Sequence, residues 1–102
     1  MPEPSLPSRP EIAELLLIYL VARGIPTKTT VCYEEMARQF QLSAKQRDAS
    51  YVGNDGRTRN TWEREVRFGR RILKDERLLL SSRRGMWTAT EKGKNLVAAK
   101  KE

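Results

Sequence analysis

The chain has 102 residues, a length that supplies one hydrophobic core and not two. Its single cysteine, Cys32, excludes an internal disulfide, and the lack of histidine removes the commonest general base and metal ligand. The apolar run of residues 15–22 is far shorter than the ~20 residues that cross a bilayer, and the N-terminal segment MPEPSLPSRP does not resemble a signal peptide. We therefore expect a soluble, cytoplasmic, single-domain binding module without a cofactor, a metal ion or a membrane partner.

The net charge of +7 is distributed unevenly along the chain. Residues 1–56 hold 6 Lys/Arg and 7 Asp/Glu, a net charge of −1, whereas residues 57–102 hold 14 Lys/Arg and 6 Asp/Glu, a net charge of +8. This polarity indicates an acidic partner, with nucleic acid as the first choice and an anionic membrane surface as the second. A charge that only keeps the protein in solution is the alternative.

The first part of the chain predicts an arm and a helix. Residues 1–8 carry three prolines and two serines, which favour a flexible N-terminal arm and leave residues 9–102 as the folded domain. Ser8 and Glu11 have the spacing of a capping box, so a helix is expected from Pro10 to Arg23. Gly24 then ends this helix, whose apolar face predicts a core position.

The middle of the chain contains shorter elements. Residues 27–31 are β-branched and polar, and fit either a brief edge strand or a loop. A second helix is expected over residues 33–41, and a Ser-x-x-Gln capping box at residues 43–46 predicts a helical turn near residues 44–50. Residues 51–60 are expected to form a loop, because two glycines flank Asn-Asp.

A long helix is predicted from about Thr61 to Glu76. Helical spacing places Trp62, Val66, Gly69 and Leu73 on one narrow stripe, which Phe68 and Ile72 widen. The opposite face collects Asn60, Glu63, Arg64, Arg67, Arg70, Arg71 and Lys74. The Glu63–Arg67 pair is the one i,i+4 ion pair expected within this face, so most of its positive charge is uncompensated.

After residue 77 the pattern changes to short strands. Residues 78–81 and 86–89 read as two strands of a hairpin around residues 82–85, with Gly85 free to take the positive φ of a tight turn. Thr90 is expected to cap a last helix over residues 91–100, with Leu96 and Val97 facing the core. This order predicts an α+β, mainly helical fold: a winged helix-turn-helix with three to four helices and a two-stranded wing.

The predicted long helix and the hairpin that follows it resemble a known family. The runs WEREVRFGRRILK (residues 62–74) and LLLSSRRGMWTATEKG (residues 78–93) are similar to the N-terminal winged-helix domain of Mrr-type restriction proteins. In that family a helix of the pattern N-R-V-x-W-A-x-x-x-L-K precedes L-L-x-S-x-x-R-G-x-W-x-[IL]-T-x-x-G. This chain departs at Arg64-Glu65, where the family has Asn-Arg, and at Phe68, where it has Trp, so the contacts of those positions are not carried over.

We expect helix 61–76 to enter the major groove of double-stranded DNA and wing 82–85 to contact the backbone or the minor groove. The candidate DNA-binding residues are Arg57, Arg59, Asn60, Thr61, Arg64, Arg67, Arg71, Lys74, Arg83 and Arg84. Tyr51 is a candidate for base contact or stacking, although a loop tyrosine more commonly covers the edge of a core. Trp62, Phe68 and Trp87 are expected in the core.

No active site is predicted. The adjacent acids at 34–35 and 75–76 diverge around their helices and form no catalytic pair, and Cys32 is expected to be inert. The family resemblance implies the target-recognition domain of a modification-dependent restriction or DNA-defence protein, associated with the nucleoid and covalently linked to a C-terminal nuclease domain. Two alternatives are a winged helix that binds an acidic protein partner and a small free-standing transcription regulator.

Overall fold

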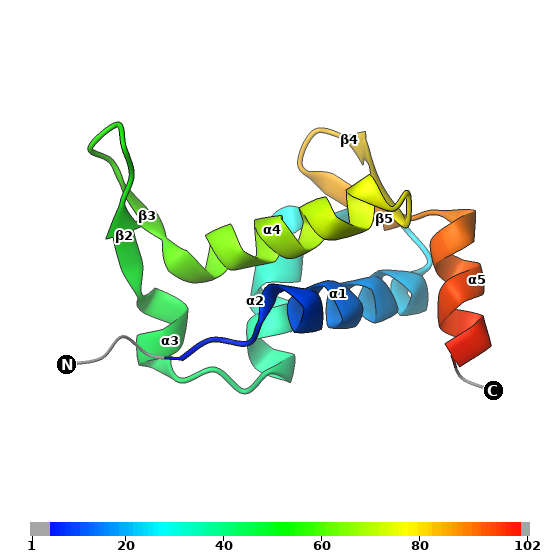
Figure 1. The fold of residues 1–102 in the computed structure, drawn as a ribbon, viewed down its shortest axis with the longest axis horizontal. Helices are drawn as coiled ribbons and strands as arrows, with labels where there is room; N and C mark the ends of the chain where they lie inside the picture. Colours follow the sequence, from blue (N-terminus) through cyan, green and yellow to red (C-terminus); the bar gives the residue numbers. More distant parts are fainter. Residues whose placement is uncertain (1–4, 101–102) are drawn as a thin grey trace.

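The computed structural model describes residues 5–100, in which helices and short strands alternate (Figure 1). The elements in chain order are α1 (Arg9–Arg23), β1 (Thr27–Lys28), α2 (Thr29–Gln39), α3 (Ala44–Asp48), β2 (Ser50–Val52), β3 (Thr58–Asn60), α4 (Thr61–Asp75), β4 (Leu79–Arg83), β5 (Met86–Ala89) and α5 (Glu91–Lys100). This α+β, mainly helical order confirms the predicted fold class and is compatible with a winged helix. The structure has five helices in its described residues, more than the three to four expected.

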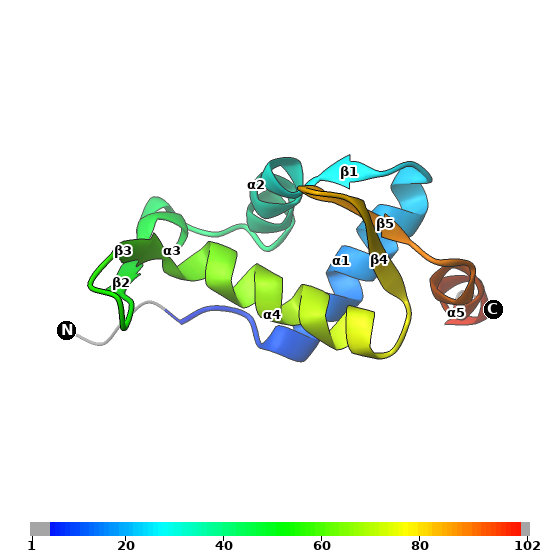
Figure 2. The ribbon, with the colours of Figure 1, turned by 90° about the horizontal axis from the view of Figure 1, so that it is seen from above.

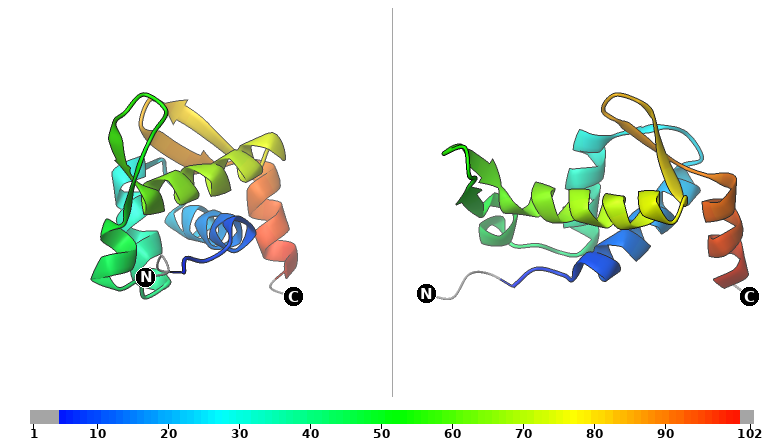
Figure 3. Two further views of the ribbon diagram at one scale, coloured as in Figure 1. Left: turned by 60° about the vertical axis from the view of Figure 1, so that its left-hand side comes forward. Right: turned by 45° about the horizontal axis from the view of Figure 1, so that its top comes forward.

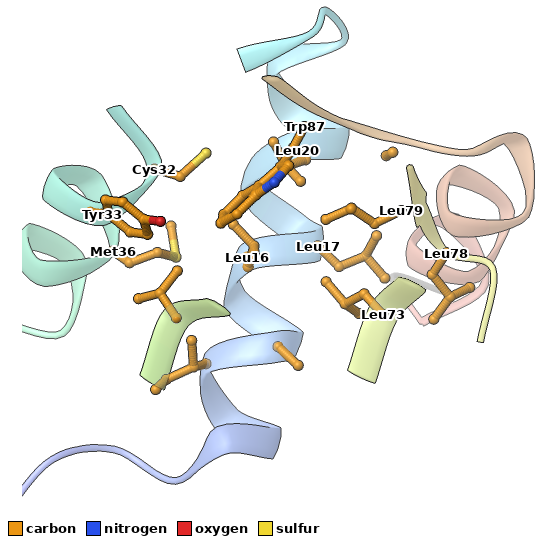
Figure 4. Close-up of a cluster of buried hydrophobic side chains, with 14 of the residues drawn as sticks. Leu16, Leu17, Leu20, Cys32, Tyr33, Met36, Leu73, Leu78, Leu79 and Trp87 are labelled. Carbon is orange, nitrogen blue, oxygen red and sulfur yellow. The ribbon is translucent and has the colours of Figure 1, made fainter. Parts of the chain in front are cut away.

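The central helix of the core is α1. Its residues Leu16, Leu17 and Leu20 lie between α2 on one side and the start of β4 on the other, with Trp87 of β5 above them (Figure 4). The long helix α4 crosses over α1 and buries the predicted stripe of Trp62, Val66, Gly69 and Leu73 (Figure 1). A Cβ atom at Gly69 would lie 3.0 Å from Ile12 Cγ2, which confirms that this glycine allows close helix packing.

The prediction for Phe68 is wrong. Its side chain is half-exposed, and the guanidinium of Arg9 lies 3.7 Å from the centroid of its ring. Phe68 is more than a third of a turn away from the centre of the buried stripe, so α1 covers Gly69 and leaves the aromatic ring to the long side chain of Arg9. The two tryptophans, Trp62 and Trp87, are buried as predicted.

Three strands form an antiparallel sheet in the order β1–β5–β4. Residues 27–28, for which the sequence allowed a strand or a loop, form β1 and pair with Trp87 and Met86 of β5 (Figure 2). The β4–β5 hairpin turns at Arg84-Gly85, where Gly85 has the expected positive φ of 76°. Strand β4 reaches Arg83 and therefore extends beyond the predicted residues 78–81. Because β1 pairs with β5, the wing is joined to the α1–α2 connection through β5.

Helix α2 begins at Thr29, four residues earlier than predicted. The run Thr29-Thr30-Val31 is β-branched, which lowers helix propensity and favours strand in a sequence reading. The structure overrides this preference because the Thr29 N–H donates to the Gly85 carbonyl at 3.0 Å and Cys32 is buried in the core. Burial raises the pKa of the Cys32 thiol to about 11, in keeping with the expected inertness of this residue.

Residues 51–60 do not form the predicted loop but most of a second hairpin. Strand β2 pairs with β3 through Tyr51–Arg59 and its two neighbouring pairs. The turn is closed by the Gly53 N–H, which donates to the Arg57 carbonyl at 2.8 Å, and by Gly56 at a φ of 79°. The glycines and Asn-Asp that indicated a loop occupy only this turn.

The N-terminal caps of α1 and α5 agree in part with the sequence prediction. The Ser8 hydroxyl caps α1 by accepting from the Glu11 N–H at 3.3 Å, and it also donates to the Glu11 carboxylate at 2.8 Å, in place of the reciprocal backbone bond of a full capping box. Thr90 caps α5 as predicted, but Leu96 is 37% exposed and Val97 alone of the expected pair is buried. Residues 1–4 of the predicted arm lie outside the described residues, and Leu6 packs against the core.

Candidate nucleic-acid interface

The rotation of α4 about its axis is fixed at its first turn. The Asn60 side chain caps the helix by accepting from the Glu63 N–H at 3.0 Å. In the same turn, the buried indole of Trp62 donates to the Tyr33 carbonyl at 2.9 Å and packs edge-on against Phe40. Because these bonds hold one side of α4 in the core, the side that carries Arg67 and Arg71 faces outward.

A groove of about 390 Å³ lies over this outward side. Its lining residues are Tyr51, Arg64, Arg67, Phe68, Arg70 and Arg71. The hairpins β2–β3 and β4–β5 rise from the same side of α4, one near each end of the helix (Figures 1 and 3). The groove is therefore a basic, partly aromatic surface between two projecting hairpins.

Of the predicted site residues, the groove brings together Tyr51, Arg64, Arg67 and Arg71. The Arg64 guanidinium lies 4.2 Å from the centroid of the Tyr51 ring and donates to Glu65 at 3.3 Å. Tyr51 is half-buried on β2 and covered by Arg64. Within residues 5–100, Arg67 and Arg71 have no ion pair and no side-chain hydrogen bond, so their donors face solvent.

Arg70 lines the groove too, although sequence reasoning did not select it. Its Nε atom is buried and has no hydrogen-bond acceptor in the described part of the chain. The guanidinium carbon lies 5.9 Å from the centroid of the Trp87 ring, at the boundary between α4 and the wing. The helical pattern placed Arg70 on the polar face, and the burial of its Nε has no signal in the local sequence.

The β2–β3 hairpin carries two of the predicted arginines. Arg59 is bound by Asp55, with 2.9 Å from Nη1 to Oδ1 and 2.5 Å from Nη2 to Oδ2. Arg57 is exposed in the turn, and its backbone N–H donates to the same carboxylate at 3.0 Å. The bonds from Arg59 and from that N–H lower the pKa of Asp55 to about 2, so this pair stays ionised at neutral pH.

Arg47 of α3 ties the base of this hairpin to two helices. Its guanidinium donates to Glu34 of α2, to Asn60 Oδ1 at 3.0 Å and to Glu63 of α4 at 3.4 Å. The Asn60 amide donates in return to the Arg47 carbonyl at 2.8 Å. The expected Glu63–Arg67 ion pair is not formed within the described residues, because Arg47 binds this carboxylate instead.

The remaining predicted residues lie around the groove. Thr61 is the first residue of α4, and its N–H donates to the Ala49 carbonyl at 2.9 Å. Lys74 is exposed in the last turn of the same helix, and Arg83 and Arg84 are exposed at the tip of the wing. Sequence reasoning also missed Arg9, which binds Glu65 through two hydrogen bonds of 3.1 and 3.2 Å across 56 residues of chain.

Other classes of site lack support in residues 5–100. No group of three or more His, Cys, Asp or Glu side chains is placed to bind a metal ion there. None of the helices in that range combines the length and the hydropathy needed to span a bilayer. A hollow of about 430 Å³ between α1, the end of α4 and α5 is lined mainly by apolar side chains, among them Leu17, Ile18 and Leu96.

We expect Arg47→Met to destabilise the fold and loosen the β2–β3 hairpin. The Arg47 side chain is only 21% exposed, and its loss leaves Glu34, Asn60 and Glu63 without their shared donor, at a cost of about 1–3 kcal/mol. Urea unfolding measures the loss. The matched control is Arg38→Met, since Arg38 is 71% exposed and binds only residues of its own helix, and its urea midpoint should stay unchanged. Equal shifts for both variants would contradict this role.

Of the comparisons with known proteins, one finds a match. No curated protein and no solved structure shows a significant match to the chain. The family described as the Mrr N-terminal domain matches residues 11–99, a range that includes all of α2 to β5. This family is an N-terminal domain and not a catalytic one, and it associates the chain with restriction systems. The chain belongs to the Mrr N-terminal domain family.

Proposed function

We propose that this domain binds double-stranded DNA and serves as the target-recognition part of a restriction or DNA-defence protein. The observation that carries the proposal is the outward face of α4, where Arg67 and Arg71 have free donors beside Arg64. A helix fits the major groove, where arginine reads guanine through two N–H groups. The family's association with restriction systems supports the same conclusion.

In this proposal each part of the interface has its own task. The outward residues of α4 contact base edges, and Arg83 and Arg84 of the wing contact the backbone or the minor groove. The β2–β3 hairpin, with Arg57 and Arg59, meets the backbone at the other end of α4, so two hairpins flank the reading helix (Figure 3). Asn60 and Thr61 contribute from the N-terminus of α4, and Lys74 from its last turn.

We further propose that residues 9–102 form one DNA-binding domain, with residues 1–8 as an arm. The domain itself performs no chemistry in this account. Cleavage would come from a covalently linked C-terminal nuclease domain, as the family's description of an N-terminal domain suggests. A DNA-binding role also places the protein on the nucleoid.

Duplex binding should weaken steeply as salt rises, because each phosphate contact releases condensed counterions. If roughly 5 phosphates are neutralised, the slope of log K against log salt is about −4 to −5. Fluorescence anisotropy with a labelled duplex at several salt concentrations measures this slope. A slope near zero, or no duplex binding at low salt, would sink the DNA proposal and favour an acidic protein partner.

Arg67→Ala and Arg84→Ala should differ in their effect on sequence preference. Arg67 has no partner within residues 5–100, so its loss affects binding and not the fold, and should cost about 1–3 kcal/mol on a preferred site while blurring base preference. Arg84→Ala at the wing should weaken all sequences alike. A panel of duplexes tests both variants. Identical behaviour across the panel would show that the assignment of helix to bases and wing to backbone is wrong.

We also propose that the domain senses modified bases in the major groove. A methyl group there can contact the aliphatic part of an arginine on α4 while the base stays stacked. The gain should be about 1 kcal/mol, since one methyl carries little more than ~0.8 kcal/mol of transfer free energy. Competition between matched methylated and plain duplexes measures it. Equal affinity removes modification sensing from this domain, and discrimination above about a hundredfold indicates an extruded base held in a pocket.

A further inference from the structure

The side chain of Arg70 has a buried hydrogen-bond donor without a partner in the described residues. This donor is its Nε–H, which has no acceptor among residues 5–100, and two carboxylates of the same helix are engaged elsewhere, Glu63 by Arg47 and Glu65 by Arg9. A buried donor without a partner is costly, and native proteins retain few of them. Such a group on a basic groove points to an acceptor that arrives with a ligand.

We propose that Arg70 anchors one backbone phosphate of the bound duplex, at the boundary between α4 and the wing. This inference rests on the proposed DNA-binding function and adds a specific residue and a specific ligand group to it. The phosphate oxygens accept from Arg70 at the inner wall of the groove, while Arg67 and Arg71 of the same helix contact the base edges.

The charge around Arg70 also suits an anion. Residues 70 and 71 are three and four positions from Arg67, so each neighbours it on the helix surface. All three line the groove, and none has an acidic partner among residues 5–100. A guanidinium presents a planar fork of donors that matches the oxygens of a phosphate, so Arg70 can bind the phosphate while Arg67 and Arg71 add positive charge beside it.

The position of Arg70 sets what its contact requires. The guanidinium lies near Trp87, which is buried. Its Nε–H is covered by protein, so the guanidinium has to turn towards the groove before a phosphate oxygen can accept from it. Phosphate contacts set the register of a protein on the duplex, and Arg70 sets it for α4 relative to the base edges.

The first test replaces single phosphates by neutral methylphosphonates along a bound duplex. Wild-type protein should lose about tenfold in affinity at one backbone position, because a charge-assisted hydrogen bond is removed there. Arg70→Lys keeps the charge but has no Nε–H, so this variant has already lost the anchor. Neutralising the same phosphate should therefore lower its affinity for the duplex by no more than about threefold.

The matched control is Arg38→Lys, an exposed arginine of α2 that should follow the wild-type profile at every position. If Arg70→Lys also follows the wild-type profile at every position, Arg70 contacts no phosphate and the proposal is overturned. Circular dichroism of each variant confirms that the comparison is made between folded proteins.

A second test uses the wild-type protein alone and needs neither a variant nor DNA. Inorganic phosphate is titrated into labelled protein, and the NMR signal of the Arg70 Nε–H is followed against that of Arg38. A saturable shift of the Arg70 signal alone supports a phosphate site at this residue. If duplex binding fails while the shift is seen, the site remains but its ligand is not duplex DNA, and that part of the proposal is overturned together with the DNA proposal. No shift at Arg70, whether or not duplex binds, overturns the phosphate anchor.

Discussion

The close approach of α1 and α4 at Gly69 determines which residues of the long helix are available to a partner. A side chain at this position would meet Ile12 Cγ2 at 3.0 Å and the backbone nitrogen of Ala13 at 3.2 Å, so the two helices pack almost backbone to backbone. Trp62 and Leu73 are drawn into the core on either side of this contact. The arginines half a turn away are thereby turned outward without any polar interaction of their own.

The positive charge of the C-terminal half is not spread evenly over the surface. Near the start of α4 the carboxylates neutralise their neighbours, with Asp55 on Arg59, and Glu65 on both Arg9 and Arg64. Between Glu65 and Asp75 every charged residue of α4 is basic: Arg67, Arg70, Arg71 and Lys74. Three of these four line the groove, so it carries positive charge without an acidic residue in its lining.

The sequence predicts well those features that depend on local periodicity. The stripe of Trp62, Val66, Gly69 and Leu73 follows from helical spacing, and the wing follows from a Gly at the turn between two apolar runs. The β2–β3 hairpin was not predicted, because its strands have three residues each and its turn composition dominates. Its stability comes from bonds across the fold, such as those of Arg47 to Asn60.

At the candidate site, too, the residues found from the sequence are those that follow from local periodicity, and the residues missed are those that depend on distant parts of the fold. Arg67 and Arg71 were selected from the face of a helix, a property that the sequence carries. Arg9 was missed because its partner Glu65 is 56 residues away, and Arg70 because nothing in the local sequence signals the burial of its Nε. Phe68 was assigned to the core because hydrophobicity alone does not show which apolar residue at the edge of a stripe the neighbouring helix will cover.

The two hairpins also bear on how such a domain can diverge. Residues 54–57 and 83–85 at their tips are exposed, whereas their bases are held by Arg47 on one side and by the β1–β5 pairing on the other. Substitutions and insertions at the tips leave the core packing untouched, as is general for exposed turns on a rigid scaffold. Selection can therefore change what the tips touch, one residue at a time, at tip positions other than Gly56 and Gly85, whose positive φ favours glycine.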